Sequence, residues 1–447
     1  MKLKLTVVAI IILFFAVAPR YILGFSLWHL DDALDVAASM GAKLACSKRY
    51  IAKLEPALIK EDLLSYSPAN TLLDIHYDDK IKRVRTDMLG LSSFQATYHE
   101  TLGCISDSES ITVPSASLTK PELSTQPWPQ GSSVNTIKPS KQSKLDALLE
   151  EDNTAGLQTR ALLWVQEGEI VAESYAPGFN HNSMLLGWSM GKSLTAMMLG
   201  RMEYLGQASR DTNNLFPAWQ NDKRKDITLE SLLTMSSGLE FDETYAPGSD
   251  STKMLFLSPS ASDIAMQATP KHPIDSHFSY SSGTTNLINR WMHDRLGNNT
   301  QASVDFLYQE LLFKLGMHHT LLETDPSGVF VGSSYIYSSA RDWARLALLM
   351  LNNGKHNNTQ LLSDEWVQKA SQQNVSNNYT AYGYQFWLNQ GREGLEYPNL
   401  PKDAFFMLGN RKQVVMMAPE SKTILIRLGW TSGNYPMDQR FSQLLAN

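Results

Sequence analysis

The feature that most constrains this chain is a serine and a lysine, Ser189 and Lys192, three residues apart at the start of an apolar segment. In a helix, side chains with this spacing lie on one face, one turn from each other. Apolar residues then recur at helical spacing as far as Gly206, a residue type that often ends a helix: Leu194, Met198, Met202 and Leu205. The sequence therefore predicts a half-buried helix that begins at the serine.

This placement gives both side chains a chemical use. A hydroxyl at a helix N-terminus lies at the positive end of the helix dipole, beside backbone N–H groups that can stabilise an oxyanion. A lysine one turn deeper loses hydration, which favours the neutral amine, and a neutral amine can accept the serine proton. Ser189 and Lys192 therefore match the Ser-x-x-Lys arrangement of hydrolases that form an acyl-serine.

The spacing alone does not establish this chemistry, because the chain contains it twice. Ser117 and Lys120 lie in a polar stretch directly before Pro121, with no apolar helix to bury the lysine, and we interpret this copy as linker. The alternative for Ser189 and Lys192 is an ordinary N-cap serine followed by an exposed helix lysine. The rest of the chain has to decide between the two.

The composition is that of a globular protein. Of the 447 residues, 43% are hydrophobic and 19% are charged, which suits a sizeable core in one large or two modest domains. The net charge of -6 gives no reason to expect a nucleic-acid partner. Phosphate-binding glycine loops, His-Glu-x-x-His and Cys-x-x-Cys are missing and the ten histidines are scattered, so we expect no metal and no cofactor.

Residues 1–25 are predicted to be a signal peptide or a membrane anchor. Two lysines precede an almost wholly apolar run over residues 5–18, which has the length of a signal-peptide core. Small residues at 16–18 suit cleavage, but Pro19 hinders it, and the apolar run can continue past Arg20 as an anchor. Either segment takes the body of the chain out of the cytoplasm, and we favour an uncleaved anchor that leaves this body in the cell envelope, in the periplasm.

Export determines what the two cysteines are expected to do. Cys46 and Cys104 are the only cysteines, so in an oxidising compartment they are expected to form one disulfide, whereas in the cytoplasm they would be free thiols. They belong to a predicted small α/β segment over residues 26–106. Its expected elements are a helix over residues 51–64 and strands over residues 71–77 and 81–88.

The rest of the chain divides into a linker and a large domain. Residues 107–141 are rich in Ser, Thr and Pro and are predicted to cross the surface as a polar linker. Residues 142–447 form the main domain, with predicted helices over 143–150, 227–233, 286–296, 302–315, 340–352 and 437–445 and strands over 159–166, 170–175, 413–418 and 423–428. The order of these elements predicts an α+β fold, in which both ends of the domain complete one antiparallel sheet and a mostly helical insert lies between them.

A series of motifs along the main domain carries a family resemblance. They are Trp188-Ser189-Met190-Gly191-Lys192-Ser193, Leu232-Leu233-Thr234-Met235-Ser236-Ser237-Gly238-Leu239, Tyr280-Ser281-Ser282-Gly283-Thr284-Thr285-Asn286-Leu287, Ser333-Ser334-Tyr335-Ile336-Tyr337 with Ala340-Arg341-Asp342-Trp343-Ala344-Arg345, and Tyr382-Gly383-Tyr384-Gln385-Phe386-Trp387. With these motifs in order, the chain from about Leu145 onward resembles the serine β-lactamase and penicillin-binding-protein superfamily. It is most similar to the class C-like branch, with esterases and 6-aminohexanoate-oligomer hydrolases. The segment between the two cysteines resembles an N-terminal extension of one group of these hydrolases.

The resemblance implies a β-lactamase-like fold and a role for three residues. Ser189 would be the nucleophile, Lys192 its proton acceptor, and Tyr280 the group that exchanges protons with the leaving group and the deacylating water. A serine hydroxyl is a poor nucleophile until a base within hydrogen-bond reach takes its proton. A phenol and an ammonium held close together share protons, so which of Lys192 and Tyr280 is the acylation base stays open.

The chain departs from the family pattern at two places. The Tyr-x-Asn of many relatives is Tyr280-Ser281-Ser282 here, so Ser282 offers a hydroxyl where relatives hold substrate with an amide. No Lys-Thr-Gly triplet precedes the last hairpin, and Gly409 or Asn410 occupies the place of the second oxyanion donor. Loss of the cation and hydroxyl that clamp a carboxylate weakens the case for β-lactams, although the two basic residues that follow could restore positive charge.

Two other readings of the serine compete with this one. The stretch Gly187-Trp188-Ser189-Met190-Gly191 also fits the nucleophile elbow of α/β-hydrolases, but that fold needs parallel strands and a late catalytic histidine, and the last histidine is His356. A non-catalytic envelope scaffold or binding module is the other. We predict an exported or membrane-anchored serine hydrolase of an ester or small amide, with β-lactamase or D-Ala-D-Ala peptidase activity as the enzymatic alternative.

Overall fold

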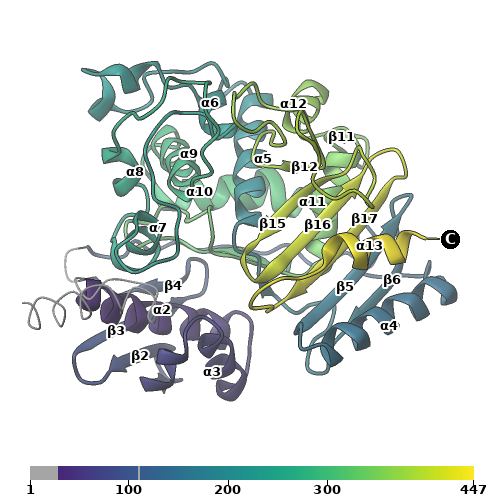
Figure 1. The fold of residues 1–447 in the computed structure, drawn as a ribbon, viewed down its shortest axis with the longest axis horizontal. Helices are drawn as coiled ribbons and strands as arrows, with labels where there is room; N and C mark the ends of the chain where they lie inside the picture. The colour runs from purple at the N-terminus through teal and green to yellow at the C-terminus, as the bar shows by residue number, and fades with distance from the viewer. Residues whose placement is uncertain (1–28, 109–110, 447) are drawn as a thin grey trace, which may run out of the picture.

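The protein folds as a small N-terminal part packed against a large mixed α/β part, as seen in a computed structural model (Figure 1). The structure describes residues 29–108 and 111–446. The predicted signal or anchor segment, residues 1–25, therefore lies outside the described residues. In the described ranges, no helix combines the length and the apolar character needed to cross a membrane.

The N-terminal part is a long helix on a four-stranded antiparallel sheet. Its elements are α2 (Leu30–Tyr50), α3 (Pro56–Leu64), β1 (Leu73–Asp78), β2 (Arg83–Met88), β3 (Ser92–His99) and β4 (Gly103–Ser106), with strand order β1-β2-β3-β4. The helix α2 and the strands β3 and β4 are not predicted from the sequence, and the helix predicted over residues 51–64 begins later, because Pro56 starts α3. Residues 38–48 of α2 are buried without interruption, so this helix lacks the one-sided apolar stripe that reveals an amphipathic helix.

The predicted disulfide is confirmed: it joins Cys46 of α2 to Cys104 of β4, with Cα atoms 5.9 Å apart. Beside it, Glu323 of the large part accepts hydrogen bonds from the Cys104 backbone N–H at 2.7 Å and the Ser47 hydroxyl at 2.8 Å. The ammonium of Lys43 lies 3.0 Å from the same carboxylate, and both side chains are buried. The bridge therefore lies where the N-terminal part is bound to the large part.

Replacing Cys46 and Cys104 by alanine is expected to lower the free energy of unfolding by about 4 kcal/mol, because the bridge closes a loop of 58 residues in the unfolded chain. Urea titration of oxidised wild type and of the double variant measures this difference. Wild type kept in reductant is the control and should approach the variant. An unfolding midpoint that does not change in either sample would contradict the prediction.

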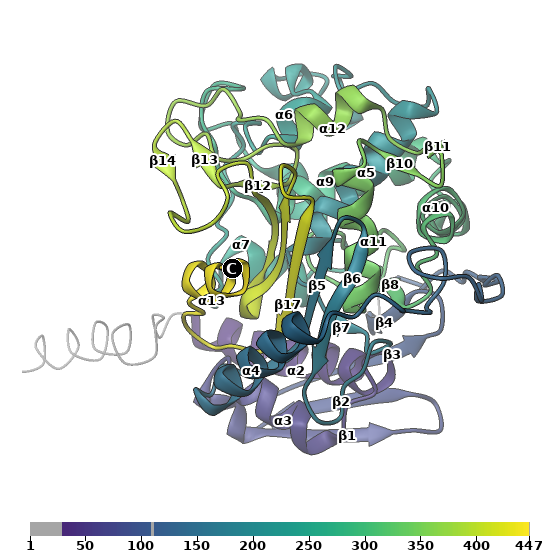
Figure 2. The same cartoon turned by 90° about the vertical axis from the view of Figure 1, so that its right-hand side faces the viewer.

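The large part is built on one antiparallel sheet of six strands in the order β12-β15-β16-β17-β5-β6, whose strands are labelled in Figure 1 and seen from the side in Figure 2. The strands are β5 (Thr159–Gln166), β6 (Glu169–Tyr175), β12 (Trp387–Leu388), β15 (Phe405–Gly409), β16 (Gln413–Ala418) and β17 (Thr423–Gly429). The late strand β17 pairs with the early strand β5, so both ends of the domain complete the sheet as predicted. All pairings in this sheet are antiparallel, which excludes the α/β-hydrolase alternative.

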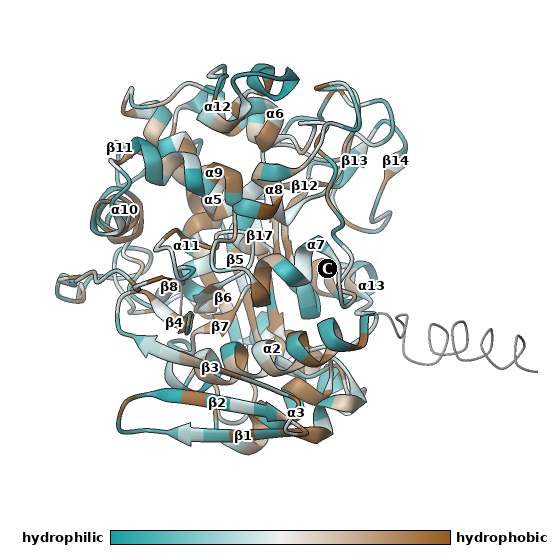
Figure 3. Cartoon of the chain, turned by 90° about the vertical axis from the view of Figure 1, so that its left-hand side faces the viewer, coloured by the Kyte–Doolittle hydropathy of each residue, from teal (hydrophilic) through white to brown (hydrophobic). Residues whose placement is uncertain are grey.

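Helices cover both faces of the sheet. Leucines of α4 (Pro139–Thr154) and apolar residues of α13 (Met437–Leu445) share one core with the outer face, and α5 (Met190–Tyr204) and α11 (Ala340–Leu351) share the main core with the inner face. The helical insert contains α6 (Leu229–Leu233), α7 (Asp250–Thr252), α8 (Asp263–Gln267), α9 (Ser282–Arg295) and α10 (Thr300–Leu307), and α12 (Asp364–Ala370) follows α11. Figure 3 shows hydrophobic residues gathered on α5 and α9 inside the molecule, while β1 and β2 at its edge are largely hydrophilic.

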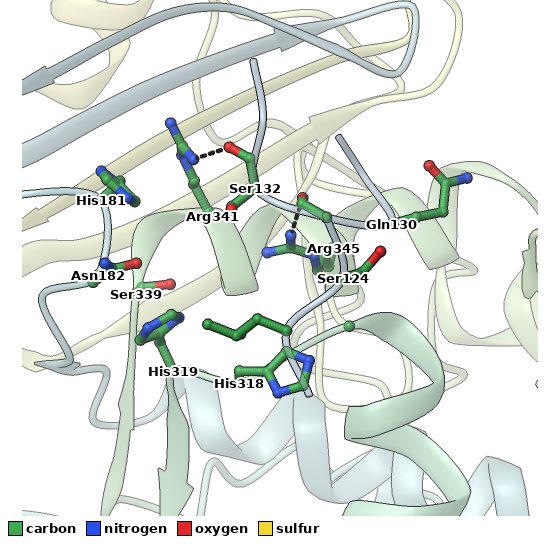
Figure 4. A pocket seen from close by; sticks show the side chains of 13 residues that line it. Ser124, Gln130, Ser132, His181, Asn182, His318, His319, Ser339, Arg341 and Arg345 are labelled. Atoms are coloured by element: carbon green, nitrogen blue, oxygen red, sulfur yellow. Dashed lines mark hydrogen bonds between the residues drawn. The ribbon is translucent and has the colours of Figure 1, made fainter. Parts of the chain in front are cut away.

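The predicted linker is held on the surface by two arginines of α11. Arg341 and Arg345 donate hydrogen bonds to the carbonyl groups of Ser132 at 2.7 Å and Gly131 at 2.8 Å (Figure 4). A small pocket beside them also contains His318 and His319. Burial, together with repulsion from Arg345, lowers the pKa of His319 to about 4, so its imidazole is neutral near pH 7. The other donors of Arg341 are engaged by Glu173 and those of Arg345 by Asp342 and the Pro129 carbonyl, and we assign this pocket to anchoring of the linker.

Candidate active site

Ser189 lies directly before α5, at the position of its N-cap, and is half-buried. Its side chain makes no capping hydrogen bond, so the ordinary N-cap reading does not hold and the hydroxyl remains available for chemistry. Close packing fixes the segment around it. A Cβ atom on Gly187 would lie 2.6 Å from the Trp343 ring, and one on Gly191 would lie 2.5 Å from the Gly332 carbonyl oxygen.

The Lys192 amine is buried beside this hydroxyl. Its residue is 1% exposed, and Nζ lies 3.1 Å from Ser189 Oγ, 2.8 Å from Ser282 Oγ and 3.1 Å from the Ser333 carbonyl oxygen. Burial lowers the pKa of Lys192 to about 8, against the opposing effect of the Glu243 charge. About a tenth of the lysine is therefore neutral at pH 7, and neutral amine is the form that a base for the serine proton requires.

Tyr280 lies against the same amine, with its ring centroid 4.8 Å from Lys192 Nζ. Burial raises its pKa well above the ordinary value, and the nearby tyrosines and Glu243 raise it further, while interaction with the Ser189 hydroxyl lowers it. Tyr382 and Trp387 enclose the ring at centroid distances of 6.1 and 5.1 Å. The phenol is therefore a fixed, protonated group next to the serine.

The structure adds Glu243, which sequence reasoning missed. Its carboxylate accepts two hydrogen bonds from Ser282, one from the backbone N–H at 2.6 Å and one from the hydroxyl at 2.5 Å. Burial raises the pKa of Glu243, and the Lys192 charge and the Ser282 hydrogen bonds oppose this effect. Glu243 lies in an irregular loop at no fixed spacing from Ser189, so its sequence position gave no signal.

A second tyrosine, Tyr245, also reaches the site and was not predicted. Desolvation raises the pKa of its phenol, and interactions with the hydroxyls of Ser189 and Ser282 lower it. The residue is 46% exposed, so it lies at the solvent side of the site. The phenols of Tyr245 and Tyr280 thus both interact with the hydroxyl of Ser189.

Gly409, at the end of β15, lies against the segment that precedes the serine. A Cβ atom on Gly409 would be 2.1 Å from the Gly187 carbonyl oxygen, so only glycine permits this approach. Asn410 follows, and its side chain accepts a hydrogen bond from the Arg411 backbone N–H at 2.7 Å. The position suits the predicted oxyanion donors, and that role for Gly409 or Asn410 stays a prediction.

The arginine in this turn contacts the N-terminal part. The Arg411 guanidinium lies 3.7 Å from the ring centroid of Tyr66. The Tyr66 ring also packs edge-on against Trp188, with 6.3 Å between the ring centroids. Trp188 directly precedes the nucleophile. A residue of the N-terminal part therefore links both elements that flank Ser189.

The second Ser-x-x-Lys copy forms no comparable arrangement. Ser117 and Lys120 lie in an irregular segment without a helix, and the Ser117 backbone N–H donates to the side chain of Gln301 at 2.8 Å. The linker interpretation of this copy is consistent with its structure. The candidate site therefore consists of Ser189, Lys192, Tyr280 and Ser282, which the sequence predicted, with Glu243 and Tyr245 added by the fold.

Comparison with known proteins agrees with this architecture. The Beta-lactamase family model matches residues 144–444. Among solved structures, the chain superposes on a protein assigned as a 6-aminohexanoate-dimer hydrolase from Bacillus anthracis with a TM-score of 0.54 and 21% identity, over 66% of this chain and 80% of the other. A family VIII carboxylesterase gives a TM-score of 0.54 and 12% identity, over 70% and 98% of the two chains.

A class C beta-lactamase gives a TM-score of 0.52 and 15% identity, over 68% of this chain and 96% of the other. At these identities the solved structures establish the fold alone. A search of curated protein sequences finds no match. The antiparallel sheet with its helical insert defines the class of serine β-lactamase and penicillin-binding-protein folds. The family match covers most of the chain, and the protein belongs to the Beta-lactamase family.

The pKa of Lys192 predicts the pH dependence of acylation. Only the neutral amine can take the Ser189 proton, so the rate of phosphonylation by a fluorophosphonate should rise about tenfold per pH unit below pH 8. Above that pH the rate should reach a plateau. Labelling rates measured by intact mass between pH 6 and 10 test this profile, and a flat profile would contradict it.

Proposed function

We propose that this protein is a serine hydrolase that forms an acyl-enzyme on Ser189 and cleaves an ester or a small amide. The observation that carries the proposal is the uncapped Ser189 hydroxyl 3.1 Å from the buried amine of Lys192. Such a pair supplies the two elements of nucleophilic catalysis, an accessible hydroxyl and a base within hydrogen-bond reach. Membership of a family whose proteins are generally serine hydrolases supports it.

In the proposed acylation step, Ser189 Oγ attacks the substrate carbonyl carbon and Lys192 takes the hydroxyl proton. The resulting oxyanion would receive hydrogen bonds from the Ser189 backbone N–H and from Gly409 or Asn410. As the bond between the carbonyl carbon and the leaving group breaks, Tyr280 gives its proton to the leaving group, and the proton held by Lys192 passes to Tyr280. In the proposed deacylation step, water attacks the acyl carbonyl carbon and gives a proton to Tyr280 or Lys192. The bond to Ser189 Oγ then breaks, Oγ takes that proton back, and the acid is released.

The two pKa values support a division of labour between lysine and tyrosine. The pKa of Lys192 is lowered to about 8, whereas that of Tyr280 is raised well above its ordinary value. A proton shared by the two groups therefore resides mainly on the phenol. We infer that Lys192 is the acylation base and Tyr280 the proton donor to the leaving group.

The site favours esters and small amides over β-lactams. The turn at residues 410–412 lacks the Lys-Thr-Gly clamp, and its Arg411 lies on Tyr66 instead of standing as an unengaged cation. The similar solved structures include a carboxylesterase and a protein assigned as a hydrolase of 6-aminohexanoate dimers. β-Lactamase and D-Ala-D-Ala peptidase activity remain the alternatives that a substrate screen tests.

We also propose that the body of the chain works outside the cytoplasm, in the cell envelope, with residues 1–25 as its signal or anchor. Disulfides persist in oxidising compartments, and the buried bridge between Cys46 and Cys104 suits such a location. Fractionation of cells that express the full chain, with and without residues 1–25, tests this proposal.

Ser189→Ala and Lys192→Ala are each expected to reduce hydrolysis of an activated ester by at least about 1000-fold, because nucleophile and base act as a unit. The folded state should survive, since both changes shorten a side chain without adding volume. Steady-state assays with matched circular dichroism spectra measure both effects. Ser117→Ala is the control and should hydrolyse the ester at the wild-type rate. Wild-type activity in Ser189→Ala would contradict the proposed mechanism.

Tyr280→Phe and Tyr245→Phe separate the two phenols near the nucleophile. If Tyr280 donates to the leaving group, its loss should slow turnover of a poor leaving group by about 100-fold or more, and slow that of a nitrophenolate much less. Tyr245→Phe should affect both substrates equally and weakly. Equal effects of both variants on both substrates would contradict the assignment.

A further inference from the structure

The hydrogen-bond directions around Lys192 are determined by its partners. A neutral amine has two N–H hydrogens and one lone pair, and Nζ has three oxygen neighbours, in Ser189, Ser282 and Ser333. Only the neighbour that faces the lone pair can donate its proton to the lysine. The direction of the other two hydrogen bonds therefore decides whether Ser189 can be activated.

Two of the three neighbours can only accept. The Ser333 group is a backbone carbonyl, 3.1 Å from Nζ, and a carbonyl has no hydrogen to donate. The Ser282 hydroxyl has one hydrogen, and that hydrogen is directed to Glu243 Oε1 at 2.5 Å. Its lone pairs are thus left to accept from Lys192 Nζ at 2.8 Å.

Glu243 in turn has to accept at both oxygens. Its Oε2 receives the Ser282 backbone N–H at 2.6 Å, and a backbone N–H can only donate. Its Oε1 receives the hydroxyl of the same residue, and the ionised carboxylate has no hydrogen to return. The order of donors is therefore Lys192 to Ser282 to Glu243.

We propose that Glu243 is a positioning residue that, through Ser282, directs the lone pair of neutral Lys192 at the Ser189 hydroxyl. This inference rests on the proposed function and adds a residue to it. With Ser282 and Ser333 accepting both amine hydrogens, the lone pair faces Ser189, which is the geometry a base needs. The Glu243 side chain would act through hydrogen-bond direction, by way of the Ser282 hydroxyl.

Protonation of Glu243 would reverse the direction of the hydrogen bonds that run from Lys192 to Ser282 to Glu243. A carboxyl hydrogen on Oε1 would be donated to Ser282, whose own hydrogen would then turn to Lys192 and occupy the lone pair. The charged and titratable groups near Glu243 are Lys192, which opposes its protonation, and Asp242, which favours it. The tyrosines Tyr245, Tyr280 and Tyr382 also face it.

The test compares Glu243→Gln with Glu243→Ala by the rate at which a fluorophosphonate labels Ser189. In the glutamine variant the amide oxygen must face the Ser282 backbone N–H, because that group can only donate. The amide NH₂ then donates to the Ser282 hydroxyl, whose own hydrogen turns to the lone pair of Lys192. Labelling should fall by about 100-fold or more, although the side chain is isosteric. In the alanine variant the Ser282 hydroxyl can rotate freely, and labelling should be at least about tenfold faster than in the glutamine variant.

A double variant and a pH profile separate hydrogen-bond direction from packing. The double variant Glu243→Gln/Ser282→Ala lacks the Ser282 hydroxyl that donates to Lys192 in Glu243→Gln. It should be labelled at the rate of Ser282→Ala alone and faster than Glu243→Gln. The Glu243 charge raises the pKa of Lys192, so the midpoint of the labelling profile in Glu243→Ala should move below that of wild type. Thermal unfolding of every variant verifies that the protein is folded.

The outcomes distinguish this inference from the function on which it rests. Wild type that is never labelled at Ser189 overturns the proposed function. Labelled wild type together with an equally fast Glu243→Gln overturns only the role of Glu243. The role of Glu243 is also overturned if Glu243→Ala is labelled more slowly than Glu243→Gln, which is the order that loss of packing produces. It is overturned as well if the double variant is labelled no faster than Glu243→Gln.

Discussion

The burial of one amine is the constraint on which the rest of the site depends. Lys192 is 1% exposed, and its three oxygen neighbours come from the N-cap of α5, from the start of α9 and from the segment before β9 (Ile336–Ser338). Removal of water lowers its pKa and so favours the neutral amine. A buried amine needs hydrogen-bond partners to be tolerated, and here these partners also determine which way its lone pair points.

The surrounding fold keeps that amine and its serine in place. Gly191 and Gly409 let two backbone segments approach more closely than a side chain would permit, and Gly187 gives the same room to the Trp343 ring. The N-terminal part contributes as well, because Tyr66 lies between Arg411 and Trp188 on the two sides of the nucleophile. The buried pair of Lys43 and Glu323 beside the disulfide holds this part on the large one.

Several elements of the fold followed from local pattern. The strands around residues 159–175 and 413–429 and the helix after Ser189 carry clear periodicity or turn signals, and the structure contains them. The helix α2 did not follow from local pattern, because its residues 38–48 are buried without interruption and show no alternation between an apolar and a polar face. The predicted helix over residues 302–315 changes into π and 3₁₀ turns after Leu307, a local departure that periodicity does not reveal.

The sequence by itself placed the proposed nucleophile Ser189 beside the proposed base Lys192, because a spacing of three residues in a helix puts both side chains on one face. It also determined the disulfide, since two cysteines allow one pairing. Tertiary structure alone decided the rest of the site. Glu243 and Tyr245 come from an irregular loop whose path is set by packing. Ser282 connects the Glu243 carboxylate to the Lys192 amine by hydrogen bonds because α9 packs against α5 in the folded protein. Sequence spacing reports neighbours within an element, whereas contacts between elements arise only when the chain is folded.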